Sequence, residues 1–242
     1  MESDYVNKTA KIILNVLILI LISIIIFLVL RNFLLDKKLK DEINKTYNLI
    51  IMDDYNYKDV YEKIDNIVTK EGYAIVEDSA KDYLLDYFLE VLNLDETYEK
   101  ANIENIISIE NIKKDGKKFK NSKETLSSLK ESIENIEEEI LNNLNKEKMI
   151  SYINDKNLAD SYIELYESLD FMKDKNIEKR KSQIEDKVNS YLSKINKIEE
   201  VIDFLIKNNN WKVENEQVKY EDEQLSIEYN EMINSIYEET NN

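Results

Sequence analysis

The chain has 242 residues, a formal net charge of −17, and 34% charged and 43% hydrophobic residues. The hydrophobic content is sufficient for a core, whereas the negative charge argues against nucleic acid as a partner, because that binding depends on cationic neutralisation of phosphates. The absence of histidine and cysteine excludes His- and Cys-based catalytic sites, the usual zinc ligands and disulfides.

An apolar run extends from Ile12 to Leu30 and is interrupted only by Asn15 and Ser23. As a helix it is roughly 28 Å long, close to the ~30 Å hydrocarbon thickness of a bilayer. It therefore predicts a transmembrane helix, in contact with the lipid bilayer through residues 12–30. No small-residue cleavage site comes after it, so we expect an uncleaved signal anchor.

The orientation of this anchor is open to two interpretations. Four cationic residues come after the run and two precede it, so a literal positive-inside count places the large C-terminal domain in the cytoplasm. N-terminal anchors with their own lysines nevertheless commonly export the domain attached to them, and long domains cross largely regardless of charge. We expect a single-pass protein of the cell membrane with an extracytoplasmic C-terminal domain, although the count of flanking cationic residues favours the opposite orientation.

Beyond the run, helical spacing is expected to continue to about residue 50, and polar residues at 53–56 then interrupt it. An apolar stripe over 57–71 predicts a second helix, with Gly72 as its C-cap. Asp78 or Ser79 is predicted to cap the next helix.

The segment 111–121 is predicted to connect two halves, with Asp115 and Gly116 in a loop or a two-residue hairpin turn. Three stripes of apolar residues spaced three and four apart come next, over 126–140, 158–172 and 184–205, with a turn at 173–176. They predict antiparallel helices that share one core, more often within the chain than between chains.

Residues 211–220 alternate apolar and polar side chains, which fits a small hairpin or an irregular loop, and 221–238 return to helical spacing. The predicted fold is therefore all-α: a single transmembrane helix and then an elongated antiparallel bundle, with a possible hairpin near 211–220. The predicted division is a tail (1–11), the anchor and its extension (12–35), a first helical segment (36–110), the connector (111–121) and the patterned bundle (122–242).

Trp211 and Tyr220 are the candidate contact residues for a partner or ligand, because aromatic side chains near a turn can stack on a sugar or on a protein side chain. The structural alternative is that both cover the end of the bundle, with the indole N–H bonded locally. Tyrosines elsewhere are also candidate contacts, since exposed aromatics are favoured at interfaces.

Acidic side chains are the only abundant catalytic group, and Glu137, Glu138 and Glu139, or Asp53 with Asp54, could bind Ca²⁺ or act as an acid and base pair. Such clusters usually form a solvated helix face. We therefore predict no catalytic residue, no metal site and no cofactor. A hydrolase would need two buried acids that face one cleft.

The organisation resembles that of small membrane-tethered proteins of bacteria with AT-rich genomes, and the last 30 or so residues are similar to tails of some of their surface proteins. This resemblance carries no functional residues across. We expect a non-enzymatic interaction or scaffold protein of the bacterial cell envelope, with an unidentified protein partner and possible homo-oligomers. The alternative is an extracytoplasmic sensory or ligand-binding module that holds a small molecule or a cell-wall fragment, distinguished by a sizeable cavity lined by tyrosines and a few polar groups.

Overall fold

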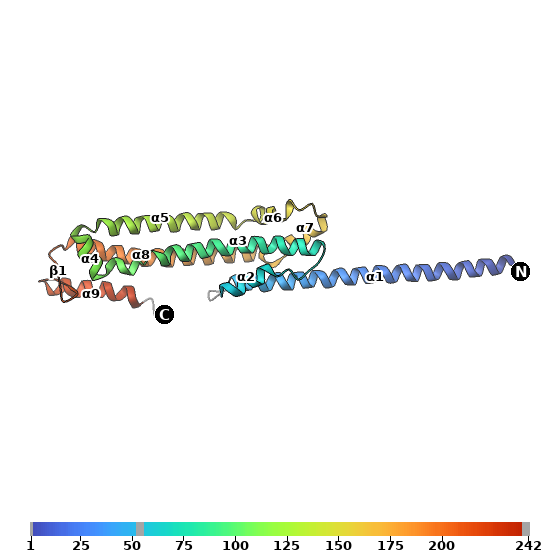
Figure 1. The fold of residues 1–242 in the computed structure, drawn as a ribbon, viewed down its shortest axis with the longest axis horizontal. Coiled ribbons are helices and arrows are strands. Elements are labelled where there is room, and N and C mark those ends of the chain that lie inside the picture. The colour runs from blue at the N-terminus through green and yellow to red at the C-terminus, as the bar shows by residue number, and fades with distance from the viewer. Residues whose placement is uncertain (1, 52–55, 239–242) are drawn as a thin grey trace. The chain divides into compact units, whose positions relative to one another are not determined.

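The computed structural model describes residues 2–51 and 56–238. Its elements, labelled in Figure 1, are α1 (Glu2–Ile50), α2 (Tyr57–Asp65), α3 (Gly72–Lys100), η1 (Ile103–Ile107), α4 (Ile109–Asp115), η2 (Gly116–Lys118), α5 (Lys120–Asn143), α6 (Lys146–Asn154), α7 (Asp160–Glu167), η3 (Asp170–Met172), α8 (Asp174–Lys207), β1 (Lys212–Glu214), β2 (Gln217–Lys219) and α9 (Glu223–Glu238). The predicted all-α class is confirmed, with a long apolar N-terminal helix and a small antiparallel hairpin.

Helix α1 is long and apolar enough to span a membrane. Every side chain from Ile13 to Leu30 is exposed, so this stretch has no protein core to pack against. A contiguous apolar surface of this kind requires lipid or another apolar partner. The same helix continues without interruption to Ile50, as expected, and the side chain of Ile12 lies outside those described.

Two predicted boundaries around Gly72 are wrong. Helix α2 ends at Asp65 rather than near residue 71, and Gly72 begins α3 instead of capping α2, so neither Asp78 nor Ser79 is a cap. A Cβ on Gly72 would lie 2.3 Å from Cζ of Tyr162. A side chain at this position would therefore require the ring of Tyr162 to move.

The described chain divides into two compact units that interleave along the sequence. Unit 1 comprises Met1–Leu85 and Met149–Lys173, and unit 2 comprises Asp86–Lys148 and Asp174–Asn242. Helix α3 therefore contributes its first half to unit 1 and its second half to unit 2.

Unit 1 combines an apolar core with a buried ionic cluster. Its core includes Leu39 and Ile43 from α1, a helix that packs against α2 and η3. Tyr83 stacks on Phe171 with ring centroids 5.4 Å apart. Tyr166, also buried, donates its hydroxyl proton to the carbonyl of Met149 at 2.9 Å.

The ionic cluster is centred on Lys81, whose side chain is 1% exposed. Its ammonium donates to Glu77 at 2.8 Å, to Glu42 at 3.1 Å and to the Asn66 carbonyl at 2.7 Å, which uses its three donors. Glu77, fully buried, also accepts from the Val68 amide and from Thr69. This cluster fastens the chain between α2 and α3 to α1.

The predicted first and third stripes are helices α5 and α8 of unit 2, which pack side by side in opposite directions (Figure 1). The predicted stripe residues are buried from Leu126 to Ile140 and from Ile184 to Leu205, except for Ile136 and Tyr191, which are half-buried. In both helices the stripe packs inward, as the 3,4 pattern indicates.

The second stripe departs from the prediction. Residues 158–172 form the short α7 and η3 instead of one helix, because the backbone at Leu169 is extended, with φ −66° and ψ 150°. They also belong to unit 1, so the three stripes do not share one core. The expected break at 173–176 is confirmed, since α8 begins at Asp174.

The connector contains helix rather than a hairpin. Gly116, with φ 71°, caps the end of α4, and the carboxylate of Asp115 accepts hydrogen bonds from the backbone amides of Asn121 and Ser122 at the start of α5. Burial alone would raise the pKa of Asp115, but these hydrogen bonds outweigh it and hold that pKa below its usual range.

Residues 211–220 form a hairpin rather than the irregular loop that their sequence also allows. Val213 lies opposite Val218, and the turn residues Asn215 and Glu216 have φ of 50° and 59°. Positive φ at both central residues is the signature of a type I′ turn, whose twist matches that of the strands. Asparagine tolerates this conformation better than glutamate, so Glu216 is held there at some cost.

The pKa of Glu90 predicts how the stability of unit 2 depends on pH. Burial, together with the charges of Glu139 and Asp86, raises the pKa of Glu90 from 4.5 to about 6, although Asn143 donates to it at 2.5 Å. A raised folded-state pKa means that stability is greatest below pH 4.5 and falls as pH rises through about 6.

The substitution Glu90→Gln should therefore stabilise unit 2 by about 1 kcal/mol at neutral pH, and should have no effect near the unfolded-state pKa. Denaturation monitored by the fluorescence of Trp211, which lies in the same unit, measures the difference. Glu138→Gln, at an exposed position of α5, is the matched control, and an equal gain there would contradict the assignment.

Candidate functional site

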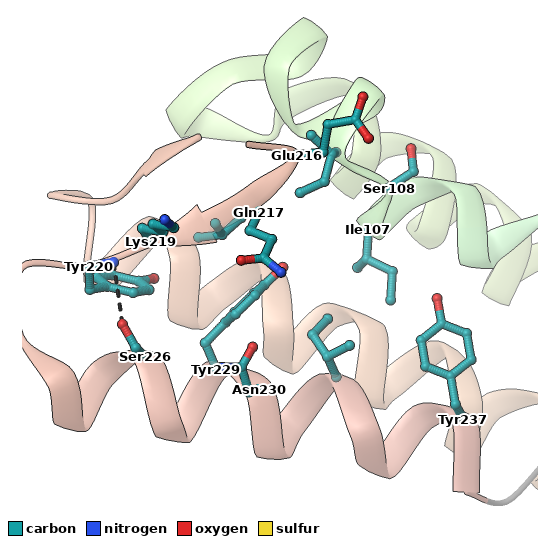
Figure 2. A pocket seen from close by; sticks show the side chains of 13 residues that line it. Ile107, Ser108, Glu216, Gln217, Lys219, Tyr220, Ser226, Tyr229, Asn230 and Tyr237 are labelled. Atoms are coloured by element: carbon teal, nitrogen blue, oxygen red, sulfur yellow. Dashed lines mark hydrogen bonds between the residues drawn. The ribbon is translucent and has the colours of Figure 1, made fainter. Parts of the chain in front are cut away.

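A groove of about 580 Å³ lies within unit 2, between the hairpin, helix α9 and the end of η1 (Figure 2). Residues 216–220, which comprise strand β2 and one residue on either side of it, form one wall, and α9 forms another from Ser226 to Tyr237. Residues 107–109, more than one hundred positions earlier in the sequence, complete the lining. The groove thus depends on the tertiary fold of the unit.

Local structure positions each wall. On α9 the lining residues Ser226, Tyr229, Asn230, Ile233 and Tyr237 are three or four positions apart except for the adjacent pair Tyr229 and Asn230, so they share one broad face of the helix. The Tyr220 amide lies 3.4 Å from the hydroxyl oxygen of Ser226, which joins the end of β2 to the start of α9 (Figure 2). Ser108, which caps α4 by accepting from the Asn111 amide at 3.2 Å, fixes the third wall.

Three tyrosines supply the aromatic surface of the groove. Tyr220 and Tyr229 are buried, with ring centroids 6.5 Å apart, whereas Tyr237 is 44% exposed at the rim. In Figure 2 the rings of Tyr229 and Tyr237 rise from α9 toward the opposite wall, where Ile107 lies. The site therefore offers buried and accessible aromatic surface together.

The hydroxyls of the two buried groove tyrosines, Tyr220 and Tyr229, remain protonated near neutral pH. Burial, with a smaller contribution from Tyr237, raises the pKa of Tyr229 to about 12. Burial also raises the pKa of Tyr220, whose hydroxyl is buried and has no hydrogen-bond partner among the described residues. Each neutral hydroxyl can donate one hydrogen bond and accept others.

The charges at the groove nearly cancel. Among the described lining residues, Glu216 is the acid and Lys219 the base, and both are exposed. A neighbouring hollow of about 570 Å³ shares Ile109 and Glu216 with the groove and adds one further acid and two lysines. The lining of the groove is thus mostly neutral, whereas that of the neighbouring hollow is mostly charged.

The structure separates the two residues that the sequence singled out. Tyr220 lines the groove, but Trp211 is not among the described lining residues. Trp211 is buried, donates its indole N–H to the Leu205 carbonyl at 2.9 Å and lies against Phe119. Its environment matches the structural alternative, in which the indole N–H is bonded locally.

Of the acidic sequence candidates, those that the structure describes are not among the lining residues of the groove. Glu137, Glu138 and Glu139 are on α5, where burial, Glu185 and Glu134 raise the pKa of Glu137, and Asp53 and Asp54 fall outside the described residues.

Two other acids, Glu42 and Glu77, are buried, but both are bonded to Lys81 in unit 1. Within the described ranges, no group of three or more acids is placed to hold a metal ion.

Sequence reasoning misses most of the groove. The spacing of the last helix places Tyr229 in its core stripe, and Ile107, Asn230 and Tyr237 carry no signal of their own. The alternation at 211–220 is the local signal that points to this region. No protein-family model matches the chain, and neither a curated protein nor a solved structure is significantly similar to it.

Proposed function

We propose that the chain is a membrane-anchored, non-enzymatic binding protein of the bacterial cell envelope, which holds a ligand in the groove of unit 2. The observation that carries this proposal is the groove itself: about 580 Å³, lined by three tyrosines and several polar side chains. Ligand sites in proteins have this size and this mixture of apolar surface and a few polar groups. The groove therefore favours a ligand-binding module over a scaffold that acts only through its outer helix faces.

The absence of histidine and cysteine supports a non-enzymatic role, since most nucleophilic and acid–base sites use one or the other. The exposed apolar stretch of α1 supports anchoring in a bilayer by a single span. Anchoring would concentrate unit 2 at the membrane surface without any further contact.

The proposal is tested by filling the groove. Asn230→Trp places a bulky ring among the lining residues, whereas Asn234→Trp makes the same change one helical turn later, at an exposed position outside the described lining. Full-length protein in lipid nanodiscs is incubated with a muramidase digest of bacterial cell wall and with cell extract. Retained compounds are then identified by mass spectrometry.

We expect wild type and Asn234→Trp to retain the same compounds, and Asn230→Trp to lose them, because the added ring occupies the site. If all three proteins retain the same set, or none retains any compound, the proposed function is wrong.

We also propose that unit 2 is extracytoplasmic. An alkaline phosphatase fused after Asn242 should be active, because this enzyme requires the oxidising exterior to form its disulfides. Activity of a cytoplasmic reporter at the same position, with an inactive phosphatase, would reverse the orientation and leave the groove facing intracellular ligands.

A further inference from the structure

The lining of the groove has a distinctive chemistry. Seven of its thirteen side chains carry a hydroxyl or an amide, and the rest are four apolar residues and one pair of opposite charges. The hydroxyl and amide members are Ser108, Gln217, Tyr220, Ser226, Tyr229, Asn230 and Tyr237. A site dominated by neutral groups that both donate and accept matches a ligand that does the same.

This lining disfavours two common ligand classes. Nucleotides and other phosphorylated compounds need cations or amide clusters to offset their charge, and Lys219 is the single base among the described lining residues. Acyl chains would bury the hydroxyls and amides without hydrogen bonds, at a cost of about 1–3 kcal/mol for each group. A neutral, polyhydroxylated ligand avoids both penalties.

The tyrosines suit such a ligand in particular. A pyranose ring has one face of C–H groups, which packs on aromatic carbon, and a rim of hydroxyls, which needs polar partners. Tyr229 and Tyr237 lie eight positions apart on one face of α9, and Asn230 and Ser226 lie between or beside them. Apolar rings and polar groups therefore alternate along one wall of the groove (Figure 2).

We propose that the groove binds a neutral saccharide, as a short segment of a glycan chain, with a sugar ring against the exposed ring of Tyr237 and sugar hydroxyls bonded to Asn230, Gln217 and Ser108. This inference rests on the proposed binding function of unit 2. The partly exposed rim at Tyr237 allows a longer chain to continue beyond the groove. A volume of about 580 Å³ accommodates a few sugar rings.

The test titrates full-length protein in nanodiscs with four neutral probes: chitotetraose, cellotetraose, maltotetraose and mannotetraose. We expect one or more to bind measurably by calorimetry. Tyr237→Ala should weaken that binding at least about tenfold, whereas Tyr237→Phe, which keeps the ring, should stay within about threefold. Ile227→Ala, an equally exposed apolar position of α9 outside the described lining, should leave the affinity unchanged.

The outcomes separate the ligand class from the binding function. Absence of binding by all four probes overturns the saccharide proposal, and so does binding that Tyr237→Ala and Asn230→Trp leave unchanged. If Asn230→Trp still removes retained compounds and these prove to be peptides or lipids, the ligand class is wrong while the binding function stands. If Asn230→Trp removes no compound, both proposals fail.

Discussion

Replacing Lys81 with methionine is expected to destabilise unit 1 by about 3 kcal/mol, the largest effect that we predict for a single substitution. Methionine fills a similar volume but leaves the carboxylates of Glu77 and Glu42 without the ammonium that they share at 2.8 and 3.1 Å. Hydrogen exchange of unit 1 peptides in detergent or nanodiscs measures the loss as faster exchange from α3.

The matched control is Lys58→Met, because Lys58 pairs with Glu62 at 3.7 Å in an ion pair whose side chains are 80% and 67% exposed. That variant should change stability by less than about 0.5 kcal/mol. Equal effects of the two substitutions would show that the buried cluster does not hold unit 1 together.

The pH dependence of the stability of unit 1 supplies a second measurement of the ionic cluster around Lys81. Burial alone would raise the pKa of Glu77, but the hydrogen bonds from Lys81, Val68 and Thr69 outweigh it and lower that pKa below 4.5. Because the pKa is lower in the folded state, ionised Glu77 contributes to the free energy of unfolding above pH 4.5. This contribution is lost as the pH falls below 4.5. We expect this loss in acid to be smaller in Lys81→Met, because its Glu77 has a higher pKa without the ammonium.

Two arginines in the middle of the apolar run should abolish membrane insertion. Ile20→Arg combined with Leu21→Arg adds roughly 2.5–3.5 kcal/mol per charge to the apparent free energy of insertion. Most of the protein should then leave the membrane fraction on carbonate extraction.

The control places the same two charges just beyond the run, as Phe33→Arg with Leu34→Arg, at exposed positions of the same helix. This variant should remain in the membrane fraction. Retention of the Ile20→Arg, Leu21→Arg variant as an integral membrane protein would contradict the assignment of residues 12–30 as the anchor.

The parts of the fold that the sequence predicts well are those with a long, uninterrupted pattern. Three such patterns extend over four helical turns or more: the apolar run that ends at Leu30 and the apolar stripes of α5 and α8. A single polar residue therefore cannot hide any of them. The hairpin also has a sequence signal, because Val213 and Val218 alternate with polar residues around a turn.

Predictions for shorter segments fail where tertiary contacts override local preference. Gly72 suggests a helix end, yet it starts α3, and the ring of Tyr162, ninety residues later, lies in the space that a Cβ would occupy. The stripe at 158–172 has helical spacing, yet it breaks at Leu169. Lys81 and Glu77 resemble an exposed i,i+4 ion pair in the sequence, since buried charges are rare and the third member of the cluster, Glu42, lies far away along the chain.

The groove lies beyond sequence reasoning for the same reason. Its walls come from residues 107–109, from β2 and from α9, and no single segment contains enough of the lining to reveal it. The sequence points to the 211–220 region and to Tyr220, whereas Tyr229, Asn230 and Tyr237 become candidates only through their shared position on α9.

The most direct test of the binding function is a ¹³C NMR spectrum of the tyrosines of the full-length protein in nanodiscs. Full-length chain with ¹³C-labelled tyrosine, in nanodiscs, is titrated with cell-wall digest supplemented with the four neutral tetrasaccharides. We predict saturable shifts of the Tyr229 and Tyr237 resonances, with Tyr98, which stacks on Tyr191 at 3.9 Å elsewhere in unit 2, unchanged. Groove tyrosines that do not shift, or a shift shared equally by Tyr98, would contradict a ligand site in the groove.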